Sequence, residues 1–247
     1  MMFCFLCQGN PFFDAYTESD LLGKIIFVIL ILLSVITWSV LIHKLWLTKQ
    51  VQKNSSAFRK TFFDSRKDPL EVPNSLTKNS EYPNAFGIIY DVLKNKTLEI
   101  FDKNRKNEPS SKKKEHLPNL SSADIALLET HATATISTLT KYLEKNLYIL
   151  STIVTLAPFL GLLGTVYGIL TTFTELKSST GGGSNQIILG GLSLALSTTV
   201  LGLIDAIPAL IGYNYLKNVV YEFDADMDRF STDVLSCLEI HYRNSGE

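Results

Sequence analysis

Charge is missing from long parts of this 247-residue chain, although the two signs nearly balance overall. The sequence holds 23 basic and 24 acidic residues, and charged residues make up 19% of it, against about 25% in a typical soluble domain. Three windows, residues 25–42, 146–174 and 178–204, contain no charged residue. Because a membrane-spanning helix needs about 20 apolar residues, the windows predict three transmembrane helices and exclude a soluble globular enzyme.

Other features are scarce as well. The formal net charge of −1 provides no basic field, so nucleic-acid binding is not expected. Three cysteines cannot build a disulfide framework, and we interpret Cys4 and Cys7 as two incidental thiols. The four histidines are scattered without helical pairing, so neither a metal site nor a cofactor is expected. Since no Ser/His/Asp grouping suggests a nucleophile, enzymatic activity is not expected either.

The distribution of basic residues predicts the orientation. Between the first and second spans, from Lys49 to Lys145, the chain carries 17 bases and 12 acids, whereas the hairpin between the second and third spans carries a single base, Lys177. The positive-inside rule then places the long loop and the C-terminal tail in the cytoplasm, and the N-terminus and the hairpin on the outer side, which is the periplasm in the bacterial inner membrane that the family resemblance described below implies. We therefore expect a periplasmic N-terminus (1–20), transmembrane helix 1 (21–47), a cytoplasmic loop (48–145), transmembrane helix 2 (146–174), a periplasmic hairpin (175–185), transmembrane helix 3 (186–216) and a cytoplasmic helical tail (217–247).

The long loop is not uniform. Residues 64–83 contain three prolines among polar residues and are interpreted as a linker. Apolar residues at helical spacing predict one amphipathic helix over 84–101. Residues 102–119 are rich in lysine, contain two prolines and have almost no apolar side chains. Such a segment cannot bury enough surface to offset its ordering entropy, so we expect it to be disordered, and its lysines leave contact with anionic lipid open.

Two long helices are expected to extend beyond the membrane. Ser121 and Asp124 form a capping box before an apolar series that keeps a spacing of three or four to Leu150 without a proline before Pro158, which predicts one uninterrupted helix into the second span. The third span continues in the same register to Leu238. The fold class is therefore an all-α membrane protein with three transmembrane helices, the second and third extended into a cytoplasmic helical bundle.

Small residues recur at a spacing of three or four in the second and third spans. Membrane helices approach closely through such residues, so the stripes predict helix packing faces, and a tightly packed hairpin is enough to explain them. The packing residues are Ala157, Gly161, Gly164, Gly168, Gly191, Ala195 and Gly202.

The third span also contains an acid, Asp205, on the same stripe. An intramembrane carboxylate costs several kcal/mol, roughly 3 on insertion scales, and is by default a functional candidate, here for reversible protonation. A hydrogen bond to the helix backbone is the structural alternative, because Pro208 cannot donate to the carbonyl of Ile204. Hydroxyls of Thr165 in the second span and of Ser197, Thr198 and Thr199 in the third suggest a polar lining, although threonine in a membrane helix often bonds only its own helix.

Two segments carry a resemblance to a known family. APFLGLLGTVYGI (157–169) and GLSLALSTTVLGLIDAIPALIGYN (191–214) resemble the signatures of the MotA/TolQ/ExbB proton-channel family. With three predicted spans, the chain is more similar to the TolQ and ExbB branches than to MotA, and its acidic helical tail is most similar to that of TolQ. The resemblance implies a ring of five copies around the helices of a TolR/ExbD-like single-span partner, a possible TolA/TonB-like further partner, and proton flow that drives work at the outer membrane.

The same resemblance implies the site residues. Thr165 and Thr199 match the signature threonines, while the family's third-span glutamate falls on Leu194. The expected proton path is therefore Thr165, Thr199 and Asp205. The missing glutamate also leaves open a structural scaffold that conducts no protons. A self-sufficient transporter is disfavoured, because three spans without a repeat do not show the duplicated halves usual in that class.

Overall fold

The computed structural model describes residues 16, 21–64, 70, 82–107, 119–178 and 184–242, with the side chains of residues 107, 178, 184–187 and 194 excepted. The expectations for Cys4 and Cys7, and for most of the N-terminus and of the linker, fall outside these residues. So do the expectations for residues 108–118 and for the turn at 179–183.

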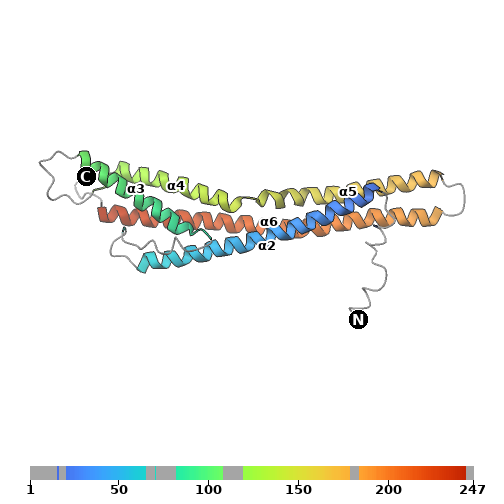
Figure 1. The fold of residues 1–247 in the computed structure, drawn as a ribbon, viewed down its shortest axis with the longest axis horizontal. Coiled ribbons are helices and arrows are strands. Elements are labelled where there is room, and N and C mark those ends of the chain that lie inside the picture. Colours follow the sequence, from blue (N-terminus) through green and yellow to red (C-terminus); the bar gives the residue numbers. More distant parts are fainter. Residues whose placement is uncertain are drawn as a thin grey trace, which may run out of the picture. The chain divides into compact units, whose positions relative to one another are not determined.

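The described chain is helical, in agreement with the expected fold class (Figure 1). Three of the helices are long and apolar enough to cross a membrane, in Leu21–Asp64, Leu147–Lys177 and Ile188–Tyr242. The helices are α2 (Leu21–Asp64), α3 (Ala85–Asn107), α4 (Ser122–Glu144), α5 (Leu147–Ser178) and α6 (Ser184–Tyr242).

The helices form two compact units. The first unit comprises residues 1–43 and 146–216, and it contains the three apolar segments of α2, α5 and α6. Its core is small and built from aliphatic and alanine side chains, while many large apolar side chains point outward. That inside-out distribution suits a lipid environment. The core residues are Ile26, Leu30, Ile153, Ala157, Ala206 and Ala209.

The second unit comprises residues 44–145 and 217–247, and it has a larger core rich in aromatic rings. The ring of Phe86 on α3 stacks on that of Phe230 on α6, with centroids 4.7 Å apart. The second half of α6 buries the apolar side chains that the sequence places at helical spacing, from Phe223 to Leu238. This unit therefore resembles the interior of a soluble helical bundle.

Helix starts in the second unit follow local signals in the sequence. Ser121 and Asp124 form the predicted capping box at α4, with bonds of 3.3 Å and 3.0 Å between each side chain and the other residue's backbone N–H. The predicted amphipathic helix is α3, and the Asn84 side chain accepts from the backbone N–H of Gly87 at 3.1 Å. Both caps satisfy backbone donors that have no partner within the helix.

Two expectations are wrong. α4 and α5 are separate helices, because the backbone leaves the helical conformation at Lys145 and Asn146 takes a positive φ of 71°. Asparagine tolerates this left-handed conformation, so a chain without proline or glycine can still break there. Disorder does not begin at residue 102 either, since α3 continues to Asn107. Arg105 and Lys106 lie in its last turn, where positive charge interacts favourably with the helix dipole.

Candidate functional site

Glycines of α5 leave the room that α6 needs in the first unit. A Cβ atom on Gly161 would lie 3.0 Å from the backbone of Thr198 and Thr199, and one on Gly164 would lie 2.3 Å from the Thr198 hydroxyl oxygen. Both positions are thus occupied by α6, as small-residue packing between membrane helices requires. The two helices run side by side over this stretch (Figure 1).

The contact extends in both directions along the hairpin. Towards the turn, a Cβ on Gly168 would lie 3.0 Å from the carbonyl oxygen of Gly191 and 3.1 Å from the Ala195 methyl. At the other end, a Cβ on Gly202 would lie 2.6 Å from the carbonyl oxygen of Ala157. All seven small residues singled out in the sequence therefore lie at a contact within one chain.

Close approach brings hydroxyl groups of the two helices together. The hydroxyls of Thr165 on α5 and Thr199 on α6 are hydrogen-bonded to each other. The carbonyl oxygen of Gly161 lies within hydrogen-bond distance of both hydroxyls, at 3.3 Å and 3.1 Å, and that of Ala195 lies 3.1 Å from the Thr165 hydroxyl. Each hydroxyl has one proton to donate, so these carbonyls are alternative acceptors. Because Gly161 has no side chain, its carbonyl is accessible to the facing helix.

Thr198 lies deeper in the same contact. Its side chain is fully buried, and its hydroxyl lies 2.9 Å from the carbonyl oxygen of Ala195 and 3.4 Å from that of Gly161. Thr165 and Thr199 are only partly buried in one chain. A hydroxyl can both donate and accept, so this pair could pass a proton along a hydrogen-bonded chain without carrying charge itself.

Asp205 does not join the threonines. It lies six residues after Thr199 on α6, which corresponds to about 9 Å of rise and a different face of the helix. Its side chain is 6% exposed and is hydrogen-bonded to Ser34 on α2. The structure therefore brings two of the three expected residues together and places the third at another helix contact. The side chain of Leu194 is not described.

Three polar residues of α2 also take part in helix contacts, and their sequence pattern did not single them out. Ser34 bonds Asp205, and Thr37, one turn further, is 1% exposed. In the second unit, Lys44 is 4% exposed and donates from Nζ to the carbonyl oxygen of Leu143 at 3.0 Å, in the last turn of α4. Their spacing could have indicated this, because these polar residues follow buried apolar neighbours such as Leu30 at intervals of three or four and so lie on the same face of α2.

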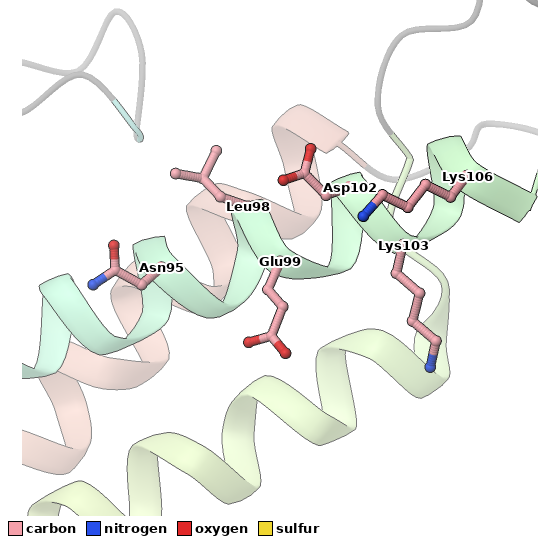
Figure 2. A pocket seen from close by; sticks show the side chains of 6 residues that line it. All are labelled: Asn95, Leu98, Glu99, Asp102, Lys103 and Lys106. Carbon is pink, nitrogen blue, oxygen red and sulfur yellow. The ribbon is translucent and has the colours of Figure 1, made fainter.

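An open hollow lies on α3 in the second unit (Figure 2). Its charges have both signs, and nearby Lys96 bonds Glu99 at 2.7 Å, which lowers the pKa of that exposed carboxyl. Among the described residues no group of His, Cys, Asp or Glu is arranged to hold a metal ion. We assign no ligand to the hollow, which is lined by Asn95, Leu98, Glu99, Asp102, Lys103 and Lys106.

The fold and the glycine-packed hairpin define a multi-pass helical membrane protein. The model of the MotA/TolQ/ExbB proton channel family matches residues 102–229, slightly more than half of the sequence, and the chain belongs to this family. The match covers the whole hairpin that carries the hydroxyl pair.

Individual relatives differ in how much of the chain they cover. "Biopolymer transport protein ExbB" of Aquifex aeolicus is 50% identical over 84 residues, 34% of this chain and 56% of the relative. ExbB of Helicobacter pylori is 54% identical over 74 residues, 30% of this chain and 50% of the relative. These matches span about half of each ExbB relative. "Tol-Pal system protein TolQ" of Haemophilus influenzae is 25% identical over 227 residues, 92% of this chain and 93% of the relative.

Proposed function

We propose that the chain is a TolQ/ExbB-like, non-enzymatic subunit of an energy transducer driven by the proton-motive force in a bacterial inner membrane. The N-terminus lies in the periplasm, and the long loop and the C-terminus lie in the cytoplasm. Family membership supports the proposal. So does the division of the chain, because a lysine of the second unit stands at each passage between the units: this unit begins at Lys44, ends at Lys145 and begins again at Lys217. Basic residues in these places favour the cytoplasmic side.

The working assembly is a ring of this chain, with five copies, around a TolR/ExbD-like single-span partner. A TolA/TonB-like protein then transmits the work to the outer membrane. Large apolar side chains that point outward from α2, α5 and α6 support an environment of lipid and further helices. Family resemblance supports the number of copies and the identity of the partners.

The hydrogen bond between Thr165 and Thr199 is the single observation that carries the proposal. Both residues match signature threonines, and the hairpin packing holds their hydroxyls in contact without closing them off completely. In the ring this pair forms part of the proton path, and Asp205 is a further protonation site on the α2 side of α6. A proton relay needs groups that accept and donate in turn, and hydroxyls and a carboxyl provide them.

Leu194 favours a second candidate. Because the resemblance puts the family's glutamate at this position, a ring that assembles with its partner without conducting protons would also fit the sequence. The two candidates differ in proton flux and agree in assembly, so one experiment separates them.

The test is proton uptake into liposomes that contain this chain and its partner, energised by a potassium diffusion potential. Thr199→Val and Thr165→Val should reduce uptake while the complex remains assembled, because valine keeps the volume and removes the hydroxyl. Thr174→Val is the matched control, since the Thr174 side chain is exposed and bonds only the carbonyl of Leu170 one turn back. No uptake by the unmodified complex would favour the scaffold. Equal uptake by all variants would remove the hydroxyl pair from the path.

A further inference from the structure

α2 and α6 are in register over two helical turns of the first unit. Ser34 bonds Asp205, and a Cβ on Gly212 would lie 1.9 Å from the Leu41 side chain. The second pair is seven residues after the first on each helix, so the two helices run in the same direction, and their facing residues advance together. This contact is separate from the one between α5 and α6 that holds the threonine pair.

Thr37 lies within this register without a hydrogen-bond partner. It falls between Ser34 and Leu41 on the same face of α2, its side chain is 1% exposed, and its Oγ1 has no partner among the described residues. Other threonines of the chain, such as Thr152 and Thr174, bond the carbonyl one turn back. Leaving a buried hydroxyl without a partner is unfavourable, so the buried Thr37 hydroxyl is a candidate ligand.

A backbone carbonyl lies at the same level. By the register above, Thr37 faces the turn of α6 that contains Pro208. Proline has no N–H, so the carbonyl of Ile204 lacks its helical donor. The carboxylate, two hydroxyls and one carbonyl are all oxygen ligands, and the register places them on adjacent turns of the two helices. Carboxylates and carbonyls freed by broken helices are the groups that hold Na⁺ or H⁺ inside membrane transporters.

No charged residue on the packed helices neutralises Asp205. On α2 the nearest are Lys24 and Lys44, each ten residues from Ser34, or about 15 Å along the helix. On α5 the charged residues are Glu175 and Lys177, at the end next to the turn, whereas the level of Asp205 is close to Ala157, which faces Gly202. A carboxylate without a counter-ion at this depth is costly unless it binds a cation.

We propose that Asp205, Ser34, Thr37 and the carbonyl of Ile204 form a binding site for one small, hard cation, a proton or Na⁺, inside each subunit. The site lies between α2 and α6. The inference rests on the protonation role of Asp205 proposed above and names the ligands around it. Because it depends on contacts within one chain, its test needs neither the ring nor the partner, and its failure can be told apart from a failure of proton uptake. Either cation would neutralise Asp205, and Na⁺ would in addition give the hydroxyl oxygen of Thr37 a partner.

The test is modification of the full-length protein in liposomes by dicyclohexylcarbodiimide, which reacts with protonated carboxyls in apolar surroundings. Mass spectrometry of the peptide that contains Asp205 gives the extent of labelling. The modification should fall about tenfold for each pH unit above the midpoint, as for one titrating group. If the site takes only a proton, replacing choline by Na⁺ changes nothing. If it takes Na⁺, the ion protects Asp205 at constant pH.

Variants separate the site from mere reagent access. Thr37→Val should shift the pH midpoint or abolish Na⁺ protection, while Thr174→Val, an exposed hydroxyl on α5, should match the unmodified protein. Asp205→Asn must remove the label from this peptide. Helix content by circular dichroism checks that each variant folds. If Thr37→Val does not fold, Ser34→Ala takes its place in the comparison. Labelling that is absent at every pH, or that is independent of both pH and Na⁺, would overturn the proposal.

Discussion

At the scale of single residues, the absence of a Cβ atom in glycine allows α5 and α6 to approach each other closely. Gly161, Gly168 and Gly202 face backbone atoms of the opposite helix, and backbone cannot move aside as the end of a flexible side chain can. The hydroxyl pair depends on the same closeness, because the Thr199 hydroxyl reaches the Gly161 carbonyl across the contact at 3.1 Å. A substitution that separates the helices by a few tenths of an ångström therefore weakens both the packing and the candidate site.

Gly202→Ala tests this dependence. The added Cβ would lie 2.6 Å from the carbonyl oxygen of Ala157, so the helices must separate. We expect a loss of about 1–3 kcal/mol in the free energy of unfolding, the usual cost of overpacking. The measurement is SDS-induced unfolding in mixed micelles followed by circular dichroism. Leu203→Ala, at an exposed neighbour, is the control and should change stability less. Equal stability of Gly202→Ala and the parent chain would mean that this contact is loose.

A second prediction at this scale concerns pH. Asp228 is an exposed residue, and partial removal of its carboxyl from water, followed in size by the charge of Asp224, raises its pKa above the ordinary value. The folded chain then binds this proton more tightly than the unfolded chain, so the ionised carboxyl destabilises the fold as pH rises through the folded pKa. Asp228→Asn should raise the thermal unfolding midpoint at neutral pH, and the gain should vanish below about pH 4, where the acid is protonated in both states.

The matched control for this change is Asp226→Asn. Asp226 lies 3.7 Å from Arg229, so its charge has an opposite partner and its removal should give no gain. A gain from Asp228→Asn that is the same at neutral and acidic pH would point to packing and not to charge.

At the scale of elements, the sequence predicts those features whose cause is local. The capping box at Ser121 and the start of α3 at Asn84 depend on side chains within three residues, and both form as the spacing indicates. The break between α4 and α5 depends on Asn146, a residue type that permits a left-handed backbone without requiring it. Tertiary packing decides whether the chain breaks there, and the hydrophobic periodicity of the sequence gives no information about that packing.

The same distinction between local and tertiary causes applies to the candidate site. Thr165 and Thr199 could be singled out from their motifs and from the small residues around them, and the structure brings them together. The partner of Asp205 could not be found in this way. Ser34 is an ordinary serine in an apolar helix until the register of α2 against α6 is known, and that register is a property of the folded unit.

Asn146→Gly and Asn146→Val test the break. Glycine adopts a φ of 71° at no steric cost, whereas a β-branched residue is strained there. We expect Asn146→Gly to keep the stability of the parent chain and Asn146→Val to lose about 1–3 kcal/mol or to extend the helix through the break. Chemical denaturation gives the free energy, and helix content by circular dichroism reports an extension. Equal stability of the two variants would show that the positive φ is not retained.

At the scale of the whole molecule, two kinds of interior coexist in one chain. The first unit packs small and aliphatic side chains and leaves large ones outside, whereas the second buries aromatic rings as soluble proteins do. α2 and α6 each supply residues to both units, so neither unit is a continuous stretch of sequence. Different surroundings, lipid for the first unit and water for the second, therefore explain the change in composition along these helices. A lysine stands at each point where the chain passes between the two units.

The proposed orientation of the chain rests on those lysines and can be measured directly. In a chain whose native cysteines are replaced by serine, Ser179→Cys lies in the hairpin and Ser111→Cys in the long loop. In intact spheroplasts a membrane-impermeant maleimide should label Ser179→Cys, while Ser111→Cys should be labelled only after lysis, because the basic loop stays in the cytoplasm. The lysed sample of each variant is its own control for reactivity. The reverse pattern would place the second unit outside the cell, and proton entry could not then drive the assembly in the proposed direction.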